Sequence, residues 1–183
     1  MKRGENSLSD LGLRYFTLLV IGIIGTPFFY FVFTFLTVNS VYFLLNLFSN
    51  PSSLISNTIM LQNTPIEIIG ACVAGSAYYL LLILNLSIPN IALKKRLFII
   101  LFSFSILFLI NVLRIFALSL LYVSQCPIFN ITHKLLWYAG SIIFVVGIWF
   151  LSVKIFKIKG IPFYSDLEFL SKDLKKIKFS KKH

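Results

Sequence analysis

Residues 97–123 read LFIILFSFSILFLINVLRIFALSLLYV, an apolar run of 27 residues in which Arg114 carries the only charge. About 20 consecutive apolar residues in a helix are enough to cross the hydrocarbon core of a bilayer. The run therefore predicts a membrane-spanning helix that holds an arginine within it.

Three other apolar stretches are similar in kind and predict further spans. They lie at residues 15–36, 66–86 and 135–153. Together the four stretches predict an all-α integral membrane protein, a bundle of about four transmembrane helices that forms one domain over residues 1–160. A chain of 183 residues leaves no room for a separate soluble domain beside such a bundle.

Two segments between the first and second spans are too short or too polar to cross a bilayer. Residues 38–48 are apolar on one face and carry Asn39, Ser40 and Asn46 on the other, which predicts a short helix in the interface or folded back against the bundle. Residues 50–65 are uncharged and rich in Asn, Ser and Pro, which predicts a loop.

The composition excludes an ordinary cytosolic enzyme. Hydrophobic residues make up 58% of the chain, charged residues make up 13%, and the mean hydropathy is +0.90. A net charge of +11 would suit a protein that binds nucleic acid. The basic residues, however, gather in clusters at the ends of the apolar runs, which is typical of membrane proteins. We therefore expect no nucleic-acid partner.

The basic clusters also predict the orientation in the membrane. Three Lys and Arg residues precede the first span, three lie between the second and third, and nine follow from Lys154 onward, whereas the other two connections hold only Lys134. Four spans with both termini in the cytoplasm place all three clusters inside, as the positive-inside rule expects. We therefore predict a multi-pass protein of the cell membrane with both termini cytoplasmic.

The C-terminal segment, residues 161–183, predicts a basic cytoplasmic tail. Ser165 and Glu168 have the spacing of a capping box, and the residues that follow alternate apolar and basic positions at helical intervals. This pattern describes an amphipathic helix lying on anionic lipid. A solvated tail suits the last six residues equally well.

Arg114 is the strongest single indication of a function. A charged side chain at the centre of a membrane helix costs about 3 kcal/mol on insertion scales, so it needs a partner and usually has a role. Asn111 lies three residues earlier on the same helical face, so both polar groups can point into one cavity. Alternatively, Arg114 extends to the outer headgroups or holds helices together.

Cys72 lies in the second span in a context of small residues, which let another helix or a substrate backbone approach closely. We expect Gly75 to support a site at Cys72 in this way. A single membrane cysteine can equally be an inert apolar side chain, and the small residues can equally form a helix-packing face.

His133 stands at the outer mouth of the fourth span, where it can exchange a proton. Glu67 is placed to orient His133 or Arg114. Each residue also has a simpler interpretation, because a histidine at the interface is often incidental and a carboxylate in the first turn of a helix is favoured by the helix dipole.

Cys72, Arg114 and His133 are all predicted to lie in the outer half of the membrane, although the orientation was derived from Lys and Arg counts alone. A thiol, a histidine base and a cation that stabilises a thiolate or an oxyanion are the parts of a cysteine acyl-transfer site. Their shared location favours such a site.

Cys126 permits two other arrangements in the outer connection. A disulfide between Cys72 and Cys126 would remove the free thiol. Both cysteines, with His133 and Glu67, are also zinc ligands by type, but no two of them have the spacing of a zinc site. We expect neither arrangement, and we expect no metal or organic cofactor.

The order of these residues resembles the exosortase/archaeosortase family of membrane cysteine transpeptidases. A cysteine among small residues, ACVAG at 71–75, is followed by NVLRI at 111–115 in the next long span and by His133 at the start of the following one. The resemblance covers residues 66–150. The small size of the chain is similar to that of the compact archaeal members.

The resemblance implies a function and a set of partners. The enzyme would cleave secreted surface proteins at a C-terminal sorting signal, which consists of a short motif, a transmembrane helix and a basic cluster. Cys72 would attack the peptide bond, His133 would move protons, and Arg114 would stabilise the thiolate or the tetrahedral oxyanion. The acyl group would pass to a lipid-linked amine, so membrane lipid is the implied acceptor, and the site would face outside.

Two other classes of function stay open at the level of sequence. One is a small transporter or channel subunit, in which Arg114 and Asn111 line a polar path. The other is a non-catalytic membrane scaffold, whose basic tail binds lipid or a cytosolic partner.

Overall fold

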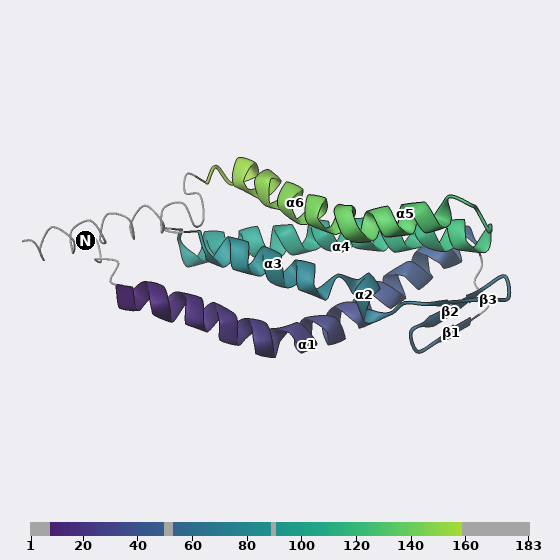
Figure 1. Cartoon of the computed structure of the whole chain (residues 1–183), viewed down its shortest axis with the longest axis horizontal. Coiled ribbons are helices and arrows are strands. Elements are labelled where there is room, and N and C mark those ends of the chain that lie inside the picture. The colour runs from purple at the N-terminus through teal and green to yellow at the C-terminus, as the bar shows by residue number, and fades with distance from the viewer. Residues whose placement is uncertain (1–7, 50–52, 89–90, 159–183) are drawn as a thin grey trace, which may run out of the picture.

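The computed structural model describes residues 8–49, 53–88 and 91–158, which form an elongated helical bundle with a small sheet at one end (Figure 1). The predicted tail at residues 161–183 lies outside this range. In chain order the elements are α1 (Leu8–Phe48), β1 (Ser53–Ile55), β2 (Thr58–Leu61), β3 (Thr64–Glu67), α2 (Gly70–Val73), α3 (Gly75–Leu86), α4 (Leu93–Val123), α5 (Phe129–Leu135), the π-helical turn η1 (Leu136–Gly140) and α6 (Ser141–Ile155).

The helices have the lengths and composition of a membrane protein. Three segments are long and apolar enough to cross a bilayer, namely Pro27–Phe48, Leu93–Val123 and Phe129–Ile155, and Gly70–Leu86 is a shorter apolar segment. The helices α1, α3, α4 and α6 run in alternating directions, so α1 begins and α6 ends at the same end of the bundle (Figure 1). The predicted helical membrane fold is confirmed at this level.

Residues 38–48 do not form a separate helix, and that prediction is wrong. They continue α1, which runs unbroken for 41 residues with Pro27 inside it. No Gly or Pro follows Pro27 within the helix, and Val41 and Leu45 at helical spacing are fully buried, so packing holds the second half in line with the first. A helix of this length extends about 60 Å, which is longer than the hydrocarbon core of a bilayer.

Residues 53–65 of the predicted loop belong instead to a small sheet, which extends to Glu67. The strands β1, β2 and β3 are antiparallel and adjacent in that order. Ser56, Asn57 and Asn63, which helped to predict a loop, lie in its two tight turns, where Ser56, Gln62 and Asn63 have positive φ. On β2 the buried side chains alternate, and Ile59 and Leu61 pack into the same core as Val41 of α1.

The predicted span over residues 66–86 is shorter than expected and is broken. Ile66 and Glu67 belong to β3, and the helix starts only at Gly70. It is interrupted at Ala74, whose φ of 60° and ψ of 34° are left-handed, and this divides the segment into α2 and α3. The other predicted spans correspond to continuous helical segments, with α4 starting at Leu93 and the last segment starting at Phe129.

Aromatic and polar contacts join the helices below the sheet. The ring of Phe33 on α1 stacks on Tyr78 of α3 with centroids 3.7 Å apart. Nearer the other end, the Ser103 and Ser152 hydroxyl oxygens lie 3.0 Å apart between α4 and α6. Arg96 donates to the carbonyls of Leu86 and Ile88, so it caps the last turn of α3 as well as adding a positive charge there.

Candidate active site

The break at Ala74 changes the hydrogen bonding of the Cys72 carbonyl. In a continuous helix this oxygen would accept from the amide of the residue four positions later. Here it accepts from two side chains of α4, with Asn111 Nδ2 at 3.0 Å and an Arg114 terminal nitrogen at 3.2 Å. A buried carbonyl without a partner is costly. The two α4 side chains therefore stabilise the break and fix the backbone of Cys72.

Arg114 contacts a second irregular segment of backbone. Its other terminal nitrogen lies 3.5 Å from the carbonyl oxygen of Leu136, where the π-helical turn η1 begins. Its Nε is buried and has no hydrogen-bond partner among the described residues. Turns of this kind occur often at functional sites. The guanidinium thus lies between the broken helix and the π-helical turn, with its positive charge at the backbone of Cys72.

A cavity of about 380 Å³ brings the predicted residues together. Cys72, Arg114, His133 and Glu67 all line it, although they come from α2, α4, α5 and β3. The other lining residues are Pro65, Ile66, Ile68, Ile69, Ala71, Ile115, Leu118, Ser119, Tyr122, Phe129 and Trp137. Thus a thiol, an imidazole, a guanidinium and a carboxylate share one mostly apolar space.

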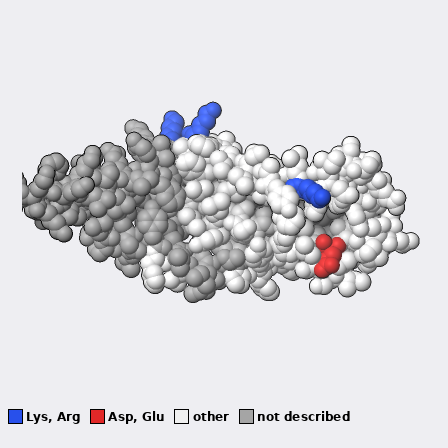
Figure 2. Space-filling model, viewed as in Figure 1, with Lys and Arg blue, Asp and Glu red and all other residues white. Residues whose placement is uncertain are grey.

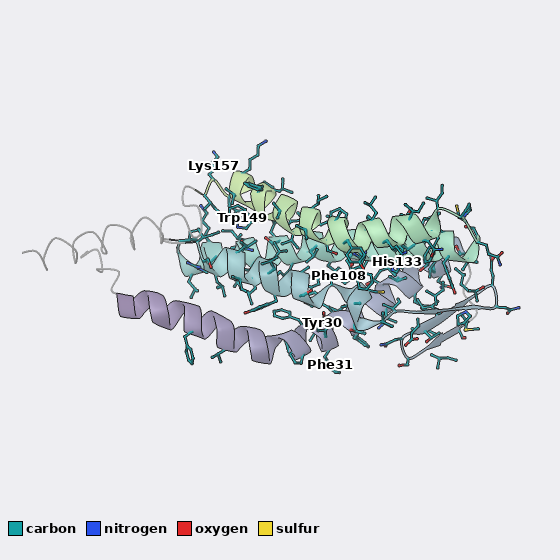
Figure 3. All side chains as sticks on the ribbon, in the orientation of Figure 1. Tyr30, Phe31, Phe108, His133, Trp149 and Lys157 are labelled. Atoms are coloured by element: carbon teal, nitrogen blue, oxygen red, sulfur yellow. The ribbon has the colours of Figure 1, made fainter. Side chains whose placement is uncertain are left out.

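The imidazole of His133 is held between two aromatic rings. It lies nearly parallel to Phe129 at 5.5 Å and 11°, and to Trp137 at 6.2 Å and 21°, one helical turn away on either side. Figure 3 shows His133 on the part of the bundle near β3 and α2. The described residues offer its ring nitrogens no hydrogen bond, so these nitrogens are available to a bound molecule in the cavity.

Glu67 is exposed at the end of β3 and lines the same cavity. Among residues whose side chains are described it is the sole carboxylate, and Figure 2 shows it as an isolated acidic group on a mostly uncharged face. It forms no ion pair with Arg114 or His133. The predicted orienting role of Glu67 is therefore not seen as a direct contact in the described part of the chain.

Gly75 does not line the cavity but packs against α1, next to the break at Ala74. A Cβ at Gly75 would lie 2.8 Å from Cζ of Tyr30, so the backbone of α3 touches the ring of α1 (Figure 3). This approach holds the break at Ala74 against α1. Asn111 is also buried outside the main cavity, and it acts through the Cys72 carbonyl.

Cys126 lies in the connection between α4 and α5, and both cysteines are free thiols. No disulfide therefore joins Cys126 to Cys72. Within the described ranges, no three His, Cys, Asp or Glu side chains gather as they would around a metal ion.

The residues of α4 and β3 that form the walls of the cavity were not predicted from the sequence. The α4 wall continues from Arg114 through Leu118 and Tyr122, with one helical turn between successive residues, so this wall could have been found from helical periodicity. The strand β3 was not predicted, because Thr64 and Pro65 fell in the expected loop and Ile66 and Glu67 in the start of the expected second span. No family model, curated protein or solved structure matches the chain.

Proposed function

We propose that the protein is a membrane cysteine transpeptidase or protease that acts on the C-terminal sorting signals of secreted surface proteins. One observation carries the proposal, which is that Cys72, Arg114 and His133 line a single cavity although they lie on three different helices. The apolar lining of that cavity suits a substrate that arrives from a membrane-embedded helix. The order of the three residues in the chain resembles that of exosortases and archaeosortases.

In the first step the Cys72 Sγ attacks the carbonyl carbon of the scissile peptide bond. His133 takes the thiol proton and then gives it to the departing amine as the C–N bond breaks. The products are a thioester between Cys72 and the N-terminal part of the substrate, and a free C-terminal helix. The stacked Phe129 and Trp137 rings hold the imidazole plane for both transfers.

Arg114 has an electrostatic role in this step. Negative charge develops first on the sulfur and then on the carbonyl oxygen, and a guanidinium fixed by hydrogen bonds beside the nucleophile stabilises both. The bonds to the carbonyls of Cys72 and Leu136 keep it in place before the substrate arrives. Such fixed charges act strongly in an apolar site because little water screens them.

In the second step an amine attacks the thioester carbon, and His133 takes a proton from that amine. The C–S bond breaks, the Cys72 thiolate is released and a new amide forms. A lipid-linked amine as acceptor would leave the secreted protein anchored to the membrane, and water as acceptor would give simple cleavage. A lipid-linked acceptor would enter the cavity from the membrane.

The charge distribution supports an orientation with this cavity outside the cell. Lys94 and Lys95 lie in the first turn of α4, Lys154 lies in the last turn of α6, and Lys157 follows it (Figure 3). These ends of the two helices are at the opposite end of the bundle from the sheet (Figure 1). Cytoplasmic loops are enriched in Lys and Arg. On this basis the protein is a component of the cell membrane with its site facing the secreted substrates.

The proposal is tested in cells that express the protein together with a reporter, a secreted protein ending in a short motif, an apolar helix and a basic cluster. Cys72→Ala should leave the C-terminal helix of the reporter attached while the enzyme accumulates normally, because the nucleophile is gone. The matched variant Cys126→Ala removes the other free thiol and should process the reporter as the wild type does. Normal processing by Cys72→Ala would end the proposal.

A further inference from the structure

The strand β3 borders the cavity along its edge. Five consecutive residues, 65–69, line the cavity. Successive side chains of a strand point to opposite faces, so a cavity on one face of a sheet is lined by every second residue. The strand residues Pro65, Ile66 and Glu67 line the cavity in succession, and Ile68 and Ile69 continue the run just beyond the strand, so the backbone edge of β3 borders the cavity.

This edge is unpaired, because the order of strands is β1-β2-β3 and no other described strand lies beside β3. The register determines which backbone groups it presents. The Ile68 amide donates to the Asn57 carbonyl at 2.9 Å, which makes that pair hydrogen-bonded, and Thr58 opposes Glu67 in the next pair. Hydrogen-bonded and open pairs alternate in antiparallel sheets. The N–H and C=O of Glu67 therefore point away from β2.

Pro65 has the same orientation as Glu67, two residues earlier in the strand. Its carbonyl faces the free edge, and it has no N–H to be left unpaired there, which is where proline is tolerated in a sheet. The free edge thus offers the Pro65 carbonyl and both backbone groups of Glu67. Five residues beyond Glu67 the chain reaches Cys72.

The opposite walls fit a chain in extended conformation. Ile115, Leu118 and Tyr122 form one face of α4, and Phe129 and Trp137 flank His133 on the α5 side. Apolar side chains on these walls can contact the side chains of a peptide, while among the described lining residues the β3 edge supplies unpaired backbone donors and acceptors in a row. A lipid chain would leave those groups without partners, and in an apolar space that is costly.

We propose that the substrate binds as a fourth strand along β3, with backbone hydrogen bonds to Glu67 and Pro65. This pairing would position the scissile peptide bond in the cavity next to Cys72. This inference rests on the proposed function, since it describes how the peptide of that reaction is held. Recognition through strand addition gives affinity from the backbone, and alternate side chains give selectivity.

The test uses wild-type protein in detergent micelles and synthetic peptides that span the processing site of the reporter. In each peptide one backbone amide is N-methylated, which removes one donor. Binding is measured as protection of Cys72 from alkylation. Amides that donate to β3 alternate with amides that point away, so we expect N-methylation to weaken binding about three- to tenfold at every second position and little between them.

The outcomes separate this inference from the proposed function. If the unmodified peptide is processed but N-methylation is tolerated everywhere, or harms binding equally at consecutive positions, strand addition to β3 is wrong and the transpeptidase proposal stands. If the unmodified peptide neither protects Cys72 nor is processed, although the reporter is processed in cells, then again the docking mode is wrong. If wild-type protein processes neither, both proposals fail.

Discussion

Arg114 combines two roles that an intramembrane arginine can have. Its guanidinium donates to the Cys72 carbonyl, which the break in the helix deprives of its usual amide donor. It also places a positive charge beside the Cys72 residue. The sequence predicted that Arg114 and Asn111 share a helical face, and the structure has both donating to one oxygen. Their target could not be predicted, because nothing in the sequence marks Ala74 as a left-handed residue.

Gly75 supplies a test at the level of single residues. Gly75→Ala should lower the stability of the protein by about 1–3 kcal/mol, because its new Cβ would lie 2.8 Å from the Tyr30 ring and force a shift in packing. Gly147→Ala is the matched control on α6, where a Cβ meets nothing within 4 Å, and it should be neutral or slightly stabilising. Thermal unfolding in detergent measures both, and an equal response of the two variants would contradict the close contact.

At the level of elements, the broken segment α2–α3 and the sheet are the features that the sequence concealed. Residues 70–86 are small and apolar enough for one helix, and tertiary contacts from Tyr30, Asn111 and Arg114 stabilise the break. In the sheet, Asn and Ser supply turns with positive φ, and the strands between them have three or four residues. Strands this short leave a weak alternating pattern, so a loop was the natural interpretation.

The break itself makes a prediction about stability. Ala74 has φ of 60°, a conformation that costs an alanine about 1–2 kcal/mol and a glycine almost nothing. Ala74→Gly should therefore raise the midpoint of thermal unfolding. Ala77→Gly, three residues later inside α3, should lower it, since glycine weakens a regular helix by roughly 1 kcal/mol. A continuous helix through residue 74 would instead make both substitutions destabilising.

At the level of the whole molecule, long apolar runs were enough to predict a membrane-embedded helical bundle and most helix positions. Periodicity and charge counts predicted Cys72, Arg114 and His133 at one end, and the structure brings them to one cavity. The cavity itself required the sheet, the broken helix and the π-helical turn together. The break and the π-helical turn are irregularities that tertiary packing imposes, and the strands are too short to leave a clear alternating pattern, so the sequence did not predict these three elements.

The proposed reaction passes through a thioester between Cys72 and the N-terminal part of the substrate. Mass spectrometry of the protein trapped during processing of the reporter should show the N-terminal part of the substrate linked to Cys72, and hydroxylamine should release it, as expected of a thioester. Cys126 should carry no adduct. Processing that continues with no adduct at Cys72, or with an adduct that resists hydroxylamine, would contradict nucleophilic catalysis by this thiol.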